Sequence, residues 1–146
     1  MPFLPKQLQL LFLLPVAALA ATTQVSTDKP IINFRLPTFT TDGYRSWLVR
    51  GSEARFTTRN QIEITELTLT IFTGKADEKI ETMILSPTAR VLTVESLVTG
   101  AGTIRVINDD FEARGAGWRY THKEKRVSIS QNVHVTFRAE LKDFLK

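Results

Sequence analysis

The stretch Ile62-Glu-Ile-Thr-Glu-Leu-Thr-Leu-Thr-Ile71 places apolar and polar side chains in alternation. Successive side chains of a β-strand point to opposite faces of a sheet, so this order predicts a strand with one apolar and one polar face. Residues typical of strands continue at similar density from Tyr44 to about Phe137. No long helical stripe of apolar residues competes with them. The sequence therefore predicts an all-β fold.

Clusters of turn-forming residues interrupt this run at short intervals, and each predicts a turn between two short strands. The clusters are Gly74-Lys-Ala-Asp77, Ser86-Pro87, Gly100-Ala-Gly102, Asn108-Asp-Asp110 and Gly115-Ala-Gly117. After them, residues 138–146 place apolar side chains at near-helical spacing, a pattern that also fits a frayed final strand.

An eight-residue pattern occurs three times, as Val49-Arg-Gly-Ser-Glu-Ala-Arg-Phe56, Ile84-Leu-Ser-Pro-Thr-Ala-Arg-Val91 and Ala113-Arg-Gly-Ala-Gly-Trp-Arg-Tyr120. Each copy begins with an apolar residue, has a small residue two places on, and ends with arginine followed by an apolar or aromatic residue. Repeats of about 30 residues in strand-rich sequence predict stacked β units that share one apolar interior. The chain is therefore expected to form an elongated sheet structure with two open ends.

The alternation slips by one residue at defined points of these repeats. One slip lies between Ile64 and Leu67, and others lie between Gly51 and Ala54 and between Gly115 and Trp118. A slip of one residue sends every later side chain to the opposite face, so the fold must absorb it with a bulge or a bend. Glycine at two of these points suits an irregular backbone.

The residues predicted to face the interior are the candidates for binding an apolar ligand, although ordinary core packing is the more common role of any one of them. They are Trp47, Val49, Phe56, Ile64, Leu69, Ile84, Val91, Ile104, Trp118, Tyr120, Val133 and Val135. Arg55, Arg90 and Arg119 occupy equivalent repeat positions and are expected as a row on the outer face. Guanidinium groups bind phosphate well, so these three are candidate phosphate contacts, although a solvated outer face is the more common role of such arginines.

The first 20 residues resemble a secretory signal rather than a membrane span. A single lysine, Lys6, precedes a short leucine-rich block, and Ala18-Leu-Ala20 offers a small-x-small cleavage site. We therefore expect residues 1–20 to be a cleaved signal peptide, 21–43 an extended lead-in, and 44–146 the β domain. The alternative is an uncleaved anchor in the inner membrane.

Composition narrows the range of functions. The chain has 146 residues, no cysteine and a net charge of +4, which excludes disulfides and thiolate chemistry and lacks the dense basic stripe of nucleic-acid binders. The two histidines, His122 and His134, lie on separate segments, and no carboxylate pair or nucleophile motif stands out. We expect no enzymatic activity, no catalytic residues, no cofactor, no metal site and no nucleic-acid partner.

Three motifs connect the chain with a known family. They are Phe34-Arg-Leu-Pro-Thr-Phe39, Asp42-Gly-Tyr-Arg-Ser-Trp-Leu-Val-Arg-Gly-Ser-Glu-Ala54, and Gly115-Ala-Gly-Trp-Arg-Tyr120 followed by Val127-Ser-Ile129 and Asn132-Val-His-Val135. Together with the export signal, the arrangement resembles periplasmic lipopolysaccharide-transport proteins of the LptC type, in the OstA-like group that also includes LptA. The resemblance implies a twisted antiparallel β-jellyroll of three OstA-like repeats.

The resemblance also implies a function in the periplasm. Acyl chains of lipopolysaccharide would lie in the apolar interior groove. Lipid would pass from an inner-membrane ABC transporter at one sheet edge to another OstA-like β protein, paired with the other edge, toward the outer membrane. LptC-type proteins commonly keep an N-terminal membrane helix, whereas this segment is predicted to be cleaved. An LptA-like soluble bridge, or a structural or adhesive β-repeat module without lipid, therefore stays open.

Overall fold

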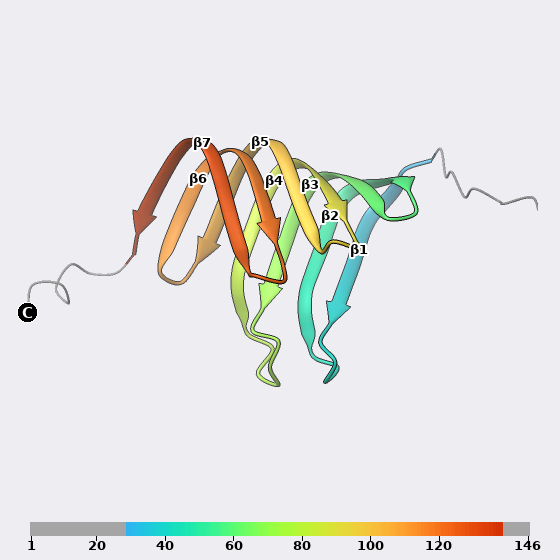
Figure 1. Ribbon diagram of the computed structural model, residues 1–146, viewed down its shortest axis with the longest axis horizontal. Helices are drawn as coiled ribbons and strands as arrows, with labels where there is room; N and C mark the ends of the chain where they lie inside the picture. Colours follow the sequence, from blue (N-terminus) through green and yellow to red (C-terminus); the bar gives the residue numbers. More distant parts are fainter. Residues whose placement is uncertain (1–28, 139–146) are drawn as a thin grey trace, which may run out of the picture.

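The computed structural model describes residues 29–138, which form seven strands in a single antiparallel sheet (Figure 1). The strands are β1 (Ile31–Phe39), β2 (Arg45–Thr58), β3 (Gln61–Phe72), β4 (Ile80–Leu92), β5 (Leu97–Asn108), β6 (Phe111–Thr121) and β7 (Arg126–Phe137). Each strand pairs with the next along the chain, in the order β1 to β7. The predicted all-β fold is confirmed, and it is consistent with a β-jellyroll.

The predicted signal segment, residues 1–20, and residues 139–146 lie outside the described residues. Residues 31–39, within the expected lead-in, are extended and pair with β2 as the first strand of the sheet. Within residues 29–138 every regular element is a strand, and the structure has no helix there that could cross a membrane.

The strands are longer than the turn signals predicted. β2 to β7 contain 11 to 14 residues each, against about five or six in an average strand. Ser86-Pro87, Gly100-Ala-Gly102 and Gly115-Ala-Gly117 lie inside β4, β5 and β6, so the expectation of short strands was wrong. These three clusters interrupt the pairing with a neighbouring strand and bend a strand that continues beyond them.

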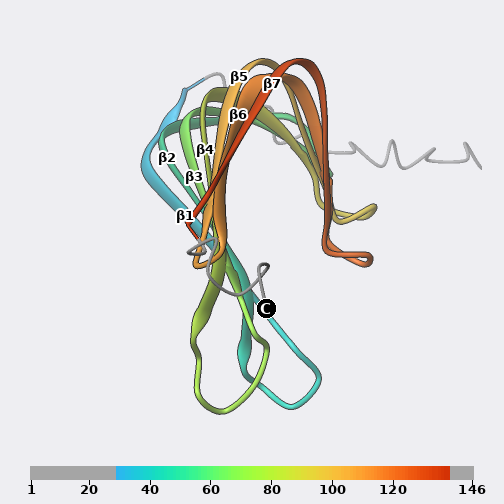
Figure 2. The ribbon, with the colours of Figure 1, turned by 90° about the vertical axis from the view of Figure 1, so that its left-hand side faces the viewer.

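The bends fold the sheet onto itself, and Figure 2 shows strands β2 to β7 arching over one shared bend into two facing leaves. The predicted change of face occurs at the bend. In β3 the buried positions change from Ile62 and Ile64 to Leu67 and Leu69, and Glu66 between them has a left-handed φ of 53°. One left-handed residue turns the strand sharply, so the apolar side chains of both leaves face the same interior.

Close packing at the bend accounts for glycine in β2. A Cβ added to Gly51 would lie 2.5 Å from Ile64 Cγ2 and 2.9 Å from Thr65 O, both on β3. Gly115 of β6 stands in an equivalent place, with Ile129 and Gln131 of β7 as its near neighbours. The absence of a side chain therefore lets adjacent strands approach each other where the sheet turns.

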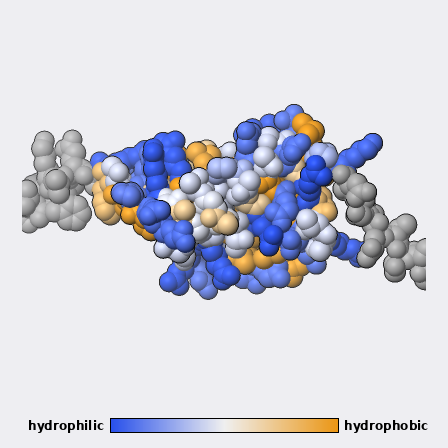
Figure 3. All heavy atoms as spheres, turned by 90° about the horizontal axis from the view of Figure 1, so that it is seen from above, coloured by the Kyte–Doolittle hydropathy of each residue, from blue (hydrophilic) through white to orange (hydrophobic). Residues whose placement is uncertain are grey.

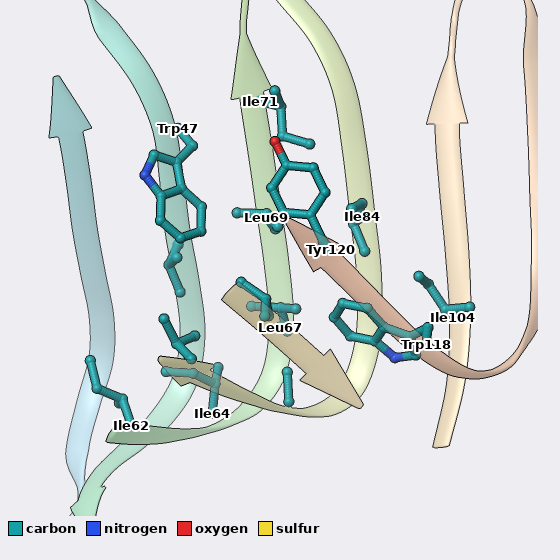
Figure 4. Close-up of a cluster of buried hydrophobic side chains, with 14 of the residues drawn as sticks. Trp47, Ile62, Ile64, Leu67, Leu69, Ile71, Ile84, Ile104, Trp118 and Tyr120 are labelled. Carbon is teal, nitrogen blue, oxygen red and sulfur yellow. The ribbon is translucent and has the colours of Figure 1, made fainter. Parts of the chain in front are cut away.

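The two leaves enclose one hydrophobic core contributed by β1 to β6. Its fully buried side chains include Leu69, Ile84, Val91 and Val98, each with 0% of its surface exposed. Figure 4 shows Trp118 and Tyr120 on β6 directed toward the apolar residues of β3 and β4. The outer face carries mainly hydrophilic side chains, with scattered hydrophobic ones, when seen from the side of the bend (Figure 3).

Candidate functional site

Of the twelve predicted interior residues, nine are buried, one is half-buried and two are exposed. Phe56 is half-buried and packs against the core, while Val133 and Val135 on β7 are 49% and 45% exposed. The nine buried residues are Trp47, Val49, Ile64, Leu69, Ile84, Val91, Ile104, Trp118 and Tyr120. In the middle of the molecule, therefore, side chains already fill the space between the leaves.

An open groove of about 700 Å³ lies between the leaves at the β7 end. Its apolar lining consists of Ile80, Val106, Phe111, Ala113, Val127, Ile129, Val133 and Val135. Small side chains such as Ala113 and Val106 leave space here, whereas Trp47, Trp118 and Tyr120 occupy the middle. A concave apolar surface of this size suits an elongated apolar ligand.

Of the apolar residues that line this groove, only Val133 and Val135 were among the predicted interior residues. The alternation of Val127 and Ile129 with serine on β7 was a usable signal for two more. Ala113 was visible only as the first position of a repeat. Ala113 matters for the groove because its side chain is small and no aromatic side chain fills the space opposite it. The alternation of apolar and polar residues contains no information about that space.

A polar cluster joins the two leaves beside the groove. The ring of His122, which follows β6, stacks on Trp47 of β2 with 4.9 Å between ring centroids and 9° between planes. His122 Nε2 lies 2.5 Å from Ser46 Oγ, and its Nδ1 lies 2.8 Å from the Tyr120 hydroxyl. Burial, and secondarily the charge of Lys125, lower the pKa of His122. Burial also raises the pKa of Tyr120.

A second polar contact between the leaves borders the groove. Lys125 Nζ lies 2.7 Å from Glu81 Oε2 and donates a hydrogen bond of 3.4 Å to the carbonyl of Phe72. Lys125 and Glu81 both line the groove, as do Lys79, Asp109 and Asp110. The border of the groove therefore carries charges of both signs.

The predicted arginine row lies on the outer face, away from the groove. Arg55, Arg90 and Arg119 are exposed, and the register aligns Arg55 with Glu63, Glu63 with Arg90, and Arg90 through Thr99 with Arg119. Arg90 Nε donates a 2.8 Å hydrogen bond to Glu63 Oε1. Their role as phosphate contacts stays a prediction, and it concerns a surface separate from the groove.

A second outer cluster surrounds Glu112 on β6. Its carboxylate accepts hydrogen bonds from Arg105 Nε at 2.6 Å and Arg114 Nε at 3.0 Å, and Arg138 lies 3.8 Å away. The hydrogen bonds from Arg105 and Arg114 lower the pKa of Glu112 to about 2. This cluster joins β5, β6 and the residue after β7 on the outer face of the groove end.

Fold and groove together define a class: a bent, single-sheet β-jellyroll with an apolar groove open at one end and, at each edge, a strand that pairs on one side only. A family model described as "Lipopolysaccharide-assembly, LptC-related" matches residues 16–138. The match covers most of the chain, so the protein belongs to the LptC family, as its motifs indicated. No curated protein sequence matches the chain. Membership of this family supports a role in lipopolysaccharide assembly.

Proposed function

We propose that the protein holds acyl chains of lipopolysaccharide in the groove at the β7 end and passes lipid through the periplasm toward the outer membrane. The observation that carries this proposal is the apolar groove of about 700 Å³, in a protein of a lipopolysaccharide-assembly family. Each methylene moved from water into such a surface contributes about 0.8 kcal/mol. About ten methylenes would contribute about 8 kcal/mol, before the cost of ordering the chain.

The unpaired edges of the sheet support the proposed handover. β1 and β7 are the outermost strands, and each pairs on one side only. An exposed edge strand can pair with a strand of another β protein. We propose that one edge receives lipid from the inner-membrane ABC transporter, and that the other pairs with a further OstA-like protein. Passive binding sites linked in this way perform no chemistry, and the transporter's ATP hydrolysis would supply the direction.

A photo-crosslinking experiment tests whether lipid occupies the groove. A photoreactive phenylalanine analogue at Val135, which lines the groove, should capture purified lipopolysaccharide on irradiation. The same analogue at Glu63, on the outer face of β3, serves as the matched control and should capture little. Capture at Glu63 equal to that at Val135 would contradict the proposal.

The handover has a test of its own because the chain has no cysteine. A cysteine introduced at His134, on the exposed strand β7, is therefore unique. It should form disulfides with single cysteines along the edge strand of an OstA-like partner in one antiparallel or parallel register. Crosslinks without any register would argue against strand pairing.

A further inference from the structure

Lys125, in the hairpin between β6 and β7, reaches across the opening between the two leaves. Lys125 belongs to one leaf, whereas its partners Glu81 on β4 and Phe72 at the end of β3 belong to the other. They are separated from it by 44 and 53 residues of chain. Figure 2 shows the hairpins of one leaf facing the strand ends of the other across the opening. The ion pair therefore lies where a ligand with its chain in the groove would place its polar end.

Two features hold Lys125 in this place. His122, three residues earlier, is anchored to the opposite leaf by stacking on Trp47 and by its contact with Ser46. The amide of Lys125 also donates a 3.1 Å hydrogen bond to the carbonyl of His122, which closes the turn. These contacts fix the position of the hairpin, and the hairpin places the ammonium group of Lys125 at the groove.

The turn itself does not require lysine. Lys125 has a left-handed φ of 46°, and Ser96, at the same position of the neighbouring β4–β5 hairpin, has φ of 51°. Both hairpins need one left-handed residue, a conformation that glycine and asparagine adopt at lower cost than lysine does. A short polar residue meets this need at position 96. The long cationic side chain at position 125 must therefore be explained by what its Nζ contacts.

We propose that Lys125 binds the anionic head group of an amphiphile and exchanges Glu81 for it when the groove is occupied. This inference rests on the proposed function, because it assumes acyl chains in the groove. Lysine is a compact point charge that binds phosphate well. Its ion pair with Glu81 is half-exposed, with side-chain exposures of 43% and 47%, and such pairs are weak enough to be replaced.

The other charges on the border decide which side of the groove the head group takes. Lys79, Glu81, Asp109 and Asp110 lie on the leaf opposite Lys125 and line the same groove. Three of these four are carboxylates, so that leaf repels an anion on balance. Lys125 is the groove-lining cation of its own leaf among residues 29–138. The head group is therefore placed on the Lys125 side, with Glu81 as its direct competitor.

Two probes with the same acyl chain test the exchange on the full chain. Oleoyl lysophosphatidic acid carries a phosphate, whereas monooleoylglycerol has an uncharged head, and calorimetry or displacement of a fluorescent fatty acid gives both dissociation constants. The wild-type protein should bind the phosphate probe about two to five times more tightly than the uncharged one. Glycerol 3-phosphate alone, which lacks the chain, should not bind measurably.

Substitutions identify the residue responsible. Lys125→Gln should abolish the preference for phosphate, so that this variant binds the two probes with equal affinity. Glu81→Gln should strengthen binding of the phosphate probe about two- to five-fold, because the competitor is removed. Lys123→Gln is the matched control, since Lys123 is exposed on the same hairpin and does not line the groove.

The outcomes separate this inference from the proposed function. Equal binding of both probes by the wild type and all variants would overturn the role of Lys125 while leaving the groove as a lipid site. An equal loss of both probes in Lys125→Gln would also overturn it, since that result indicates a structural role. Failure of every amphiphile, lipopolysaccharide included, to bind any variant would instead refute the proposed function.

Discussion

Adding a single methyl group at the bend should destabilise the fold, and the two candidate glycines differ in a way that makes the test sharp. In Gly51→Ala the new Cβ would lie 2.5 Å from Ile64 Cγ2 and 2.9 Å from Thr65 O. One neighbour is a rigid β-branched side chain and the other is backbone, so β2 and β3 must move apart. Overpacking of this kind costs about 1–3 kcal/mol.

Gly102→Ala on β5 is the matched control. A Cβ there meets nothing within 4 Å, and the residue has no left-handed φ. Alanine should then be neutral, or stabilise by about 0.4–1 kcal/mol through the unfolded chain.

Urea unfolding followed by tryptophan fluorescence, with thermal unfolding as a second measure, would compare the two variants. A domain of this size loses about 4 °C in Tm per kcal/mol, so Gly51→Ala should lower Tm by about 4–12 °C relative to the wild type. Equal stability of Gly51→Ala and Gly102→Ala would refute the reasoning, because it would show that close approach of β2 and β3 does not require glycine.

Three further outcomes follow from individual side chains. Trp47→Phe should cost at least about 1 kcal/mol less in unfolding free energy than Trp118→Phe. Trp47 Nε1 is buried without a partner among the described residues, whereas Trp118 Nε1 donates a 3.3 Å hydrogen bond to Ser86 Oγ. Equal losses in urea unfolding would contradict this expectation. The pKa of His122 is lowered from 6.5 in the folded protein. The contribution of neutral His122 to stability is therefore complete above pH 6.5 and is lost as the pH falls through the lower folded pKa. Over that pH range Tm should drop in the wild type and change less in His122→Gln. The carboxyl of Glu112 should titrate near pH 2 by NMR, and replacing either hydrogen-bonding arginine should raise its pKa toward 4.5; a midpoint near 4.5 in the wild type would show that these contacts do not persist in solution.

Most of the fold could be predicted because strand alternation is a local property. All five apolar side chains of Ile62–Ile71 are buried as their order predicted, including the change of face between Ile64 and Leu67, whereas the burial of Thr70 was not predicted. The signals that misled were Ser86-Pro87 and the glycines of β5 and β6. These residues favour irregular backbone in any context, and the sequence does not say whether the chain reverses or only bends there. The chain only bends there, because the same two strands pair on both sides of the bend.

The candidate site was predicted less well than the fold, because it depends on contacts between distant residues. Alternation identifies Trp118 and Val135 equally as inward, yet one is 4% and the other 45% exposed. The difference arises from which side chains stand opposite, across the two leaves. The ion pair of Lys125 with Glu81 joins residues 44 positions apart. A single sequence contains no local signal for such a contact.

The bend also links the two parts of the proposed function. Each strand from β2 to β7 crosses the bend and contributes to both leaves, so the groove is a consequence of the sheet rather than a separate cavity. A strand added at β7 by a partner of the same bent shape would extend both leaves together. Strand pairing would then lengthen the groove in the same step that joins the proteins, and the open apolar surface at Val133, Val135 and Phe137 would become its interior. Lipid could move along such a continuous surface without its acyl chains entering water, which is the requirement that a periplasmic route for an amphiphile must meet.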